Sequence, residues 1–233
     1  MNITKTIQDD ANLIPLQGLG VSRVKQEINL STWKRREHFE FFKDFDEPLF
    51  GLTVKVECSQ AYKTAKEMAF PFSLYYLYLS LKAVNKIEEF RYRIEENTVF
   101  CYERVGAGPT IFREDETFGY GFYPYYEDIE MFMSIAKKEN ERVKAERGLK
   151  FPHFGEDIIH YSTLPWADFS SVNHARMLNA ARSVPKITFG KITNDGKKMW
   201  LPVDIHVSHA LMDGYHVGKF VERFQELLKT PNP

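Results

Sequence analysis

The sequence predicts a single α/β domain, an α+β two-layer sandwich with a mixed β-sheet and helices packed on one face. Two observations lead to this prediction. Short stretches in which apolar and polar residues alternate, typical of strands, are mixed with longer stretches at helical spacing. No internal repeat, low-complexity tract or Gly/Ser linker interrupts the 233 residues, which are enough for one sizeable core. Because a sheet face and a helix stripe must each be buried, this mixture favours a layered domain.

The first third of the chain is expected to hold a helix, a strand and a second helical region. Residues 31–45 repeat apolar side chains at helical spacing, and Ser31 or Thr32 is the expected capping residue. Residues 48–59 alternate apolar and polar side chains, which predicts a strand. Residues 60–87 predict helical segments that are broken at an internal proline.

The middle of the chain predicts a hairpin, a long helix and a strand. Residues 90–106 place two short apolar runs around Glu96-Asn97, the pattern of a hairpin. Residues 126–148 form a strongly amphipathic pattern that ends at a glycine, as a helix does. Residues 157–166 predict a strand.

The C-terminal part predicts a second hairpin and a last helix. Residues 186–208 contain two strand patterns joined by Asn194-Asp195-Gly196, a strong hairpin turn. Residues 214–229 carry apolar side chains along one face at helical spacing.

Composition limits the possible functions. The formal net charge of -1 gives no electrostatic footprint for nucleic acid or an acidic membrane surface. No apolar run approaches the ~20 residues that span a bilayer, and the N-terminus has no signal-peptide pattern. With only Cys58 and Cys101, a disulfide framework is not expected. We therefore expect a cytoplasmic protein with neither a nucleic-acid nor a membrane partner. Its 15% aromatic content fits either core packing or a pocket for a flat, partly apolar ligand.

The stretch VDIHVSHALMDGYHVGKF, residues 203–220, concentrates titratable groups near the C-terminus. It contains His206, His209, Asp213 and His216. Strand alternation places His206 on the face opposite the apolar residues, and His209 falls where the strand ends. Asp213 stands where it can cap the last helix.

Three interpretations of this stretch compete. The histidines can be ordinary loop residues beside a helix cap. They can be zinc ligands, although zinc needs three or four converging ligands and no cysteine lies nearby. One of them can be a general base, a neutral imidazole that takes a proton from a hydroxyl.

Four blocks of the chain, in order, resemble the chloramphenicol acetyltransferase family. They are WKRREHFEFF (33–42), STLPWADF (162–169), ITFGK (187–191) and the H-x-x-x-D-G signature that begins at His209. The resemblance runs from about Ile28 to the end. It implies an acetyltransferase domain over 28–233 with the fold of CoA-dependent acyltransferases, after an N-terminal extension over 1–27.

The resemblance also implies roles for individual residues. His209 matches the general base that removes the proton of an acceptor hydroxyl as the oxygen attacks the thioester of acetyl-CoA. Ser162 matches the donor to the resulting oxyanion, and Thr188 a threonine that helps through bound water. Asp213 matches an aspartate that braces the histidine loop by pairing with an arginine, here Arg35, or Arg36 if the register shifts by one. No metal and no acyl-enzyme are implied.

Family resemblance further implies a homotrimer with active sites at the subunit interfaces and a small-molecule hydroxyl acceptor. The acceptor pocket is expected to include Phe42, Phe112, Trp166, Val172 and His174. His206 and His216 receive no catalytic role.

The chain departs from the family pattern at several positions. Ser208 stands where the family has the first of two histidines. Phe42 replaces a tyrosine, and Val172 and His174 replace a phenylalanine and a leucine. The predicted acceptor is therefore chloramphenicol or a related hydroxylated molecule. The alternative is a non-catalytic trimeric relative that binds small molecules.

Overall fold

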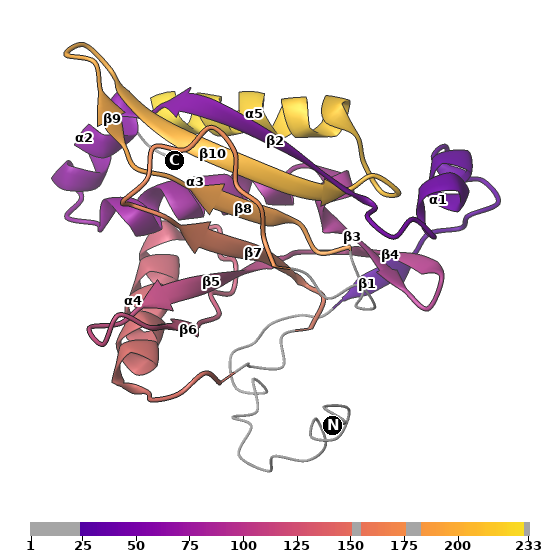
Figure 1. Cartoon of the computed structure of the whole chain (residues 1–233), viewed down its shortest axis with the longest axis horizontal. Coiled ribbons are helices and arrows are strands. Elements are labelled where there is room, and N and C mark those ends of the chain that lie inside the picture. The colour runs from indigo at the N-terminus through magenta and orange to yellow at the C-terminus, as the bar shows by residue number, and fades with distance from the viewer. Residues whose placement is uncertain (1–23, 151–154, 176–182, 231–233) are drawn as a thin grey trace.

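The computed structural model describes residues 24–150, 155–175 and 183–230, and its central feature is a mixed β-sheet (Figure 1). The strands are β2 (Leu49–Glu57), β5 (Gly106–Phe112), β6 (Phe118–Tyr120), β7 (Ile158–Thr163), β8 (Lys186–Phe189), β9 (Thr193–Asn194) and β10 (Met199–Ser208). Within the described ranges the order is β2-β10-β8-β7-β5-β6, and β9 pairs with β10 outside this order. β7 runs parallel to β5 and β8, whereas β10 is antiparallel to β2 and β8, so the sheet is mixed as predicted.

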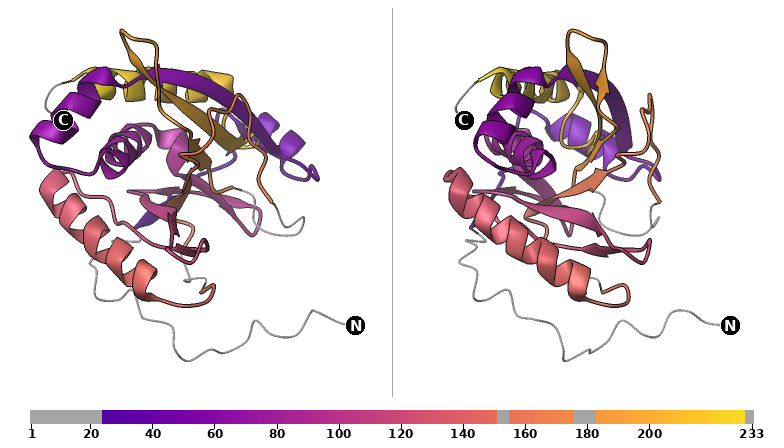
Figure 2. Two further views of the ribbon diagram at one scale, coloured as in Figure 1. Left: turned by 60° about the vertical axis from the view of Figure 1, so that its left-hand side comes forward. Right: turned by 90° about the vertical axis from the view of Figure 1, so that its left-hand side faces the viewer.

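The longer helices form the second layer. They are α2 (Ser59–Glu67), α3 (Phe72–Asn85), α4 (Ile129–Ala145) and α5 (Gly214–Lys229). Figure 2 shows α2, α3 and α5 together on one side of the sheet, and α4 lies beside β5 and β6. α3 is buried almost all round because sheet and helices both cover it. The predicted two-layer α/β fold is confirmed. No helix in the described ranges is long and apolar enough to span a membrane.

A smaller sheet lies beside the N-terminal part of the fold. Its strands are β1 (Lys25–Glu27), β3 (Tyr92–Glu95) and β4 (Thr98–Tyr102), in the order β1-β4-β3. The β3–β4 turn has φ of +48° at Glu96 and +70° at Asn97, as a two-residue hairpin turn requires. The hairpin prediction is thereby confirmed. The domain boundary after residue 27 stays a prediction, and residues 1–23 lie outside the described part.

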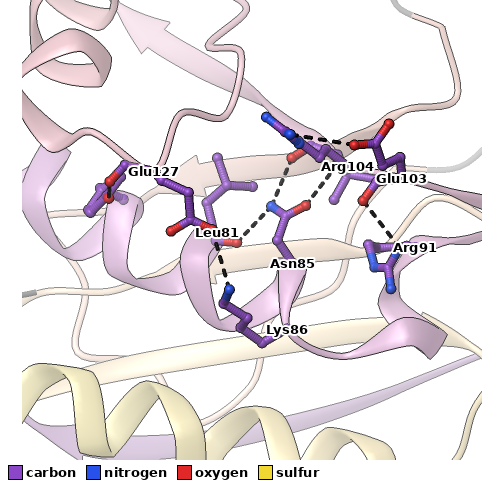
Figure 3. A network of polar contacts seen from close by, with 9 residues as sticks. Leu81, Asn85, Lys86, Arg91, Glu103, Arg104 and Glu127 are labelled. Carbon is purple, nitrogen blue, oxygen red and sulfur yellow. Dashed lines mark hydrogen bonds and ion pairs between the residues drawn. The ribbon is translucent and has the colours of Figure 1, made fainter. Parts of the chain in front are cut away.

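Asn85, at the end of α3, joins this helix to the strand that follows the hairpin (Figure 3). Its amide donates to the carbonyl oxygens of Leu81, at 2.9 Å, and Val105, at 3.0 Å. Its own oxygen accepts from the Val105 N–H at 2.9 Å. The neighbouring Lys86 pairs with Glu127 at 3.3 Å, ahead of α4. One amide therefore satisfies backbone groups that regular secondary structure leaves unpaired.

One prediction about local structure is wrong in its bounds and its cap, and two strands were missed. The helix expected over 31–45 is only α1 (Arg36–Phe42), and it begins without a side-chain cap. Ser31 instead donates to the Asn29 side chain in a turn. Strands β5 and β6 were not predicted, because glycines and a proline erase their alternation. At Gly106 the glycine is needed, since a Cβ would lie 2.8 Å from the Tyr123 carbonyl oxygen.

Candidate active site

His209 lies on the short loop between β10 and α5, directly after the strand. Its N–H donates to the Pro48 carbonyl oxygen at 2.8 Å, which fixes the loop to the start of β2. The following residues, Ala210 and Leu211, are fully buried in a small apolar cluster with Phe39 of α1. The loop is therefore held by packing on one side and by the backbone on the other.

The imidazole ring of His209 lies between aromatic side chains. It stacks on Phe42 with ring centroids 4.2 Å apart and planes 10° from parallel. The ring of Phe50 lies 4.8 Å away at 46°. Nδ1 of His209 is buried and has no hydrogen-bond partner among the described residues. A ring held in this way has a fixed orientation, which proton transfer requires. Phe42, expected in the acceptor pocket, thus contacts the predicted base directly.

Arg35 and Asp213 form an ion pair behind the histidine. Nη1 of Arg35 lies 2.7 Å from Oδ2 of Asp213, and Nη2 donates to the His209 carbonyl oxygen at 3.3 Å. Asp213 also caps α5, because its Oδ1 accepts from the Tyr215 N–H at 3.0 Å. Partial burial raises the pKa of Asp213, but Arg35 and other donors outweigh this, so the pKa lies below its usual range. The arginine is the one predicted, and Arg36 is exposed.

His216 has a structural role that the sequence did not reveal. Its Nδ1 accepts from the Asp213 N–H at 3.2 Å, which completes a reciprocal capping box at the start of α5. Its Nε2 lies 3.3 Å from a carboxylate oxygen of Glu89. The position three residues after the cap was the available signal, but histidine is not the usual residue there.

The face of the sheet opposite α2, α3 and α5 carries rows of polar side chains. The first row crosses four strands and consists of Thr53, Asp204, Thr188 and Ser162, each opposite the next. The Ser162 hydroxyl accepts from Thr110 at 3.4 Å. The two predicted oxyanion residues, Ser162 and Thr188, are therefore neighbours on adjacent parallel strands.

A second row lies two residues away along each strand and contains His206, Lys186 and His160. Burial lowers the pKa of His160 to about 4, and the nearby charge of Lys186 adds to the effect. His160 is therefore neutral near pH 7.

Residues 164–175 cover part of this polar face. In Figure 1 the segment after β7 passes in front of β8 and β10, and Figure 2 shows it on the side away from the helices. His174 Nε2 lies 3.1 Å from the Thr188 hydroxyl, and the Val172 carbonyl oxygen lies 3.1 Å from His206 Nε2. Burial lowers the pKa of His174, and Lys186 acts in the same direction.

Phe112 and Trp166 form a separate exposed pair. Their ring centroids lie 5.1 Å apart at 68°, and the side chains are 49% and 65% exposed. Neither shows a ring contact with Phe42 or His209 in the described part of the chain. The expected pocket residues thus fall into three places: Phe42 beside His209, Val172 and His174 beside Thr188, and this exposed pair.

A single chain does not bring the base to the oxyanion donor. Ser162 lies opposite Thr188, which lies opposite Asp204, and His209 comes five residues after Asp204, directly beyond the end of β10. At ~3.3 Å per residue, that is roughly 16 Å along the strand, in addition to the spacing between strands. The described residues also contain no group of three or more His, Cys, Asp or Glu side chains placed to hold a metal ion.

Comparison with known proteins identifies the class and then the family. A solved structure described as a probable dihydrolipoamide acetyltransferase from Listeria monocytogenes matches 83% of this chain and 88% of its own, with a TM-score of 0.60 at 11% identity. At that identity the match shows a shared fold alone, in agreement with the CoA-dependent acyltransferase fold expected from the sequence. A solved chloramphenicol acetyltransferase matches 88% of this chain and 100% of its own, with a TM-score of 0.79 and 28% identity.

Sequence matches agree with the structural ones. The family model described as chloramphenicol acetyltransferase matches residues 25–225. Chloramphenicol acetyltransferase 3 of Escherichia coli is 35% identical over 211 residues, which cover 88% of this chain and 97% of that protein. A chloramphenicol acetyltransferase of Proteus mirabilis is 31% identical over 204 residues, covering 85% and 92%. The chain belongs to the chloramphenicol acetyltransferase family, and the predictions of that family and of an acyltransferase are confirmed.

Proposed function

We propose that this protein transfers the acetyl group of acetyl-CoA to a hydroxyl of chloramphenicol or a related small molecule, with His209 as the general base. The observation that carries the proposal is the fixed imidazole: it stacks on Phe42, and its loop is tied to Arg35 and Asp213. Such a ring is prepared for proton transfer without further rearrangement. Relatives at up to 35% identity carry the name of this activity.

In the proposed reaction both substrates are bound together. Because Nδ1 of His209 is buried, Nε2 is proposed as the nitrogen that faces the acceptor. It takes the hydroxyl proton as the acceptor oxygen attacks the thioester carbonyl carbon. When the tetrahedral intermediate collapses, the C–S bond breaks and the proton passes to the thiolate, giving free CoA. Neither cysteine takes part and no metal is needed.

Ser162 and Thr188 are proposed to stabilise the oxyanion. Their two hydroxyls lie on neighbouring parallel strands, whose pairing fixes their positions. They can donate to an oxygen that gains charge in the transition state. The separation of Ser162 from His209 within one chain supports a site completed by a second subunit. We therefore propose a homotrimer in which one subunit supplies His209 and its neighbour supplies Ser162, Thr188 and His174.

The pocket for the acceptor is proposed to combine side chains from both subunits. Phe42 would come with His209, and Val172 with Ser162. The exposed Phe112–Trp166 pair is available to a neighbouring chain or to substrate. A cytoplasmic location is proposed because Cys58 and Cys101 are free thiols.

The proposal is tested by the release of free thiol from acetyl-CoA in the presence of chloramphenicol. Replacing His209 with alanine should lower kcat by roughly 10²–10⁴-fold, the usual contribution of a general base. His38→Ala is the matched control, because His38 is an exposed histidine on α1. Thiol release that survives His209→Ala unchanged would contradict the assignment of the base. Chloramphenicol binding without turnover by the wild type would instead favour the non-catalytic alternative.

A further inference from the structure

We propose that Asp204 and His206 are positioning residues of the acceptor site, which hold the segment around Val172 and thereby set His174 against Thr188. This inference rests on the proposed function, since it concerns the same site. His206 looked like a bystander in the sequence because its hydrogen-bond partner, Val172, lies in a loop more than thirty positions earlier.

The pair is buried, and the hydrogen bond from His206 to the Val172 carbonyl defines the tautomer. Asp204 is 2% exposed and His206 is 7% exposed. Nε2 of His206 lies 2.9 Å from the carboxylate of Asp204 and 3.1 Å from the Val172 carbonyl oxygen. The Val172 carbonyl oxygen can only accept, so Nε2 carries the hydrogen and donates it there, and Oδ2 of Asp204 lies beside the same N–H. Thr53 donates to the other carboxylate oxygen at 2.6 Å, which fixes the carboxylate itself.

The neighbouring strand is shaped around this ring. Gly51 lies directly opposite His206 on β2, and a Cβ at that position would lie 2.7 Å from two atoms of the imidazole. Any side chain there would push the ring away from the Val172 carbonyl. The absence of a side chain at Gly51 is thus an independent sign that the ring occupies a defined place.

Residues 170–175 contact this ring at two residues, Val172 and His174. The segment has no helix or strand of its own. Contacts of this segment with the sheet include Val172 O to His206 and His174 Nε2 to the Thr188 hydroxyl, the latter at 3.1 Å. The rings of His174 and His206 also meet edge to face, with centroids 5.5 Å apart at 84°. A shift of His206 therefore moves His174 relative to Thr188.

The consequence concerns the acceptor. His174 and Thr188 present a hydrogen-bonding pair in the proposed pocket, so this part of the pocket suits a polar group of the acceptor. Loss of the hydrogen bond between His206 and Val172 should weaken acceptor binding and leave acetyl-CoA binding unchanged. Replacing a residue with a merely structural role would change the binding of both substrates or only the thermal stability.

Two amide variants of His206 separate these possibilities. His206→Gln keeps an N–H donor at about the position of Nε2, whereas His206→Asn is one methylene shorter and does not reach the Val172 carbonyl. In the intact full-length protein, hydrogen exchange of the amides of residues 170–175 should rise about tenfold in His206→Asn and Asp204→Ala, and stay near wild type in His206→Gln. Lys55→Gln is the matched control, because it removes only an exposed ion pair to Asp168 in the same covering segment.

Kinetics with chloramphenicol and acetyl-CoA give the second readout. The KM for chloramphenicol should rise about tenfold in His206→Asn and return in His206→Gln, with the KM for acetyl-CoA unchanged. Unchanged exchange in His206→Asn, an equal rise of both KM values, or faster exchange with an unaltered chloramphenicol KM would each overturn the inference. If the wild type releases no thiol, the proposed function fails, and the exchange measurement alone then decides whether His206 positions the segment.

Discussion

Replacing Arg35 with methionine should loosen the loop that carries His209 without unfolding the protein. The guanidinium makes two contacts there: 2.7 Å to the Asp213 carboxylate and 3.3 Å to the His209 carbonyl oxygen. Methionine keeps most of the apolar stem and removes both hydrogen bonds. Asp213 still caps α5 through the Tyr215 N–H, so the helix itself should persist.

The size of the effect follows from the exposure of the pair. A hydrogen bond to a charged group contributes about 1.5–3 kcal/mol when buried. The Arg35 side chain is 12% exposed and that of Asp213 33%, so solvent screens the pair and about 1–2 kcal/mol of stability should be lost. If the same free energy is lost from the alignment of His209, kcat should fall about 5- to 30-fold.

Thermal unfolding measures the loss of stability, and thiol release measures the fall in kcat. Arg36→Met is the matched control, since Arg36 is exposed and adjacent. The pKa of Asp213 is depressed in the folded protein, so its contribution is present above the pKa of the unfolded chain and is lost as pH falls through the folded value. The stability difference between wild type and Arg35→Met should therefore shrink in acid. Equal kcat losses in the two arginine variants, or full kcat in Arg35→Met, would refute the reasoning.

Three further predictions concern stability and thiol reactivity. Because the pKa of His160 is lowered to about 4, the unfolded chain binds a proton there that the folded chain does not, and stability should fall from about pH 6.5 to 4, by about 2 kcal/mol after allowance for partial exposure. His160→Gln should flatten this dependence in thermal unfolding. Gly119→Ala should lower Tm at a cost of about 1–3 kcal/mol, because a Cβ would lie 2.5 Å from Arg113 and 2.6 Å from Val143. Burial raises the pKa of Cys58 to about 12, so a thiol reagent at pH 8 should label it only after unfolding.

The Gly119 prediction has a control within the chain, and each of the three has an outcome that would contradict it. Gly218→Ala in α5 meets no atom within 4 Å and should raise Tm slightly, as alanine does in a helix. A Tm loss equal to that of Gly119→Ala would exclude steric crowding as the cause. If the stability of His160→Gln depends on pH as that of the wild type does, another group titrates. Rapid labelling of Cys58 in the folded protein, located by mass spectrometry, would contradict its burial.

The sequence predicted the parts of the site that are local in the chain. The loop at His209 and the cap at Asp213 follow from strand alternation and helix spacing over a few residues, and the pairing with Arg35 followed from the family resemblance. His206 was misjudged because its partners, Asp204 apart, are brought to it by sheet register and by a distant segment. That register pairs His206 with Gly51 of β2 and Lys186 of β8, and the sequence pattern of one strand does not reveal its register with another.

The same contrast between local sequence patterns and long-range contacts applies to the fold. α3, α4 and α5 were predicted from apolar periodicity, since each buries one face or its whole surface. β5 was not predicted, because Gly106 and its neighbours are chosen for close packing against Tyr123 and not for alternation.

The central claim is that one subunit supplies His209 and its neighbour supplies Ser162. Mixing His209→Ala with Ser162→Ala protein after reversible dissociation tests this claim directly. Each variant alone should release thiol far more slowly than the wild type. In a mixed trimer one of the three interfaces joins an intact His209 to an intact Ser162, so equal random mixing should restore about a quarter of the wild-type activity. No recovery in trimers verified by mass spectrometry to contain both variants would contradict the shared site.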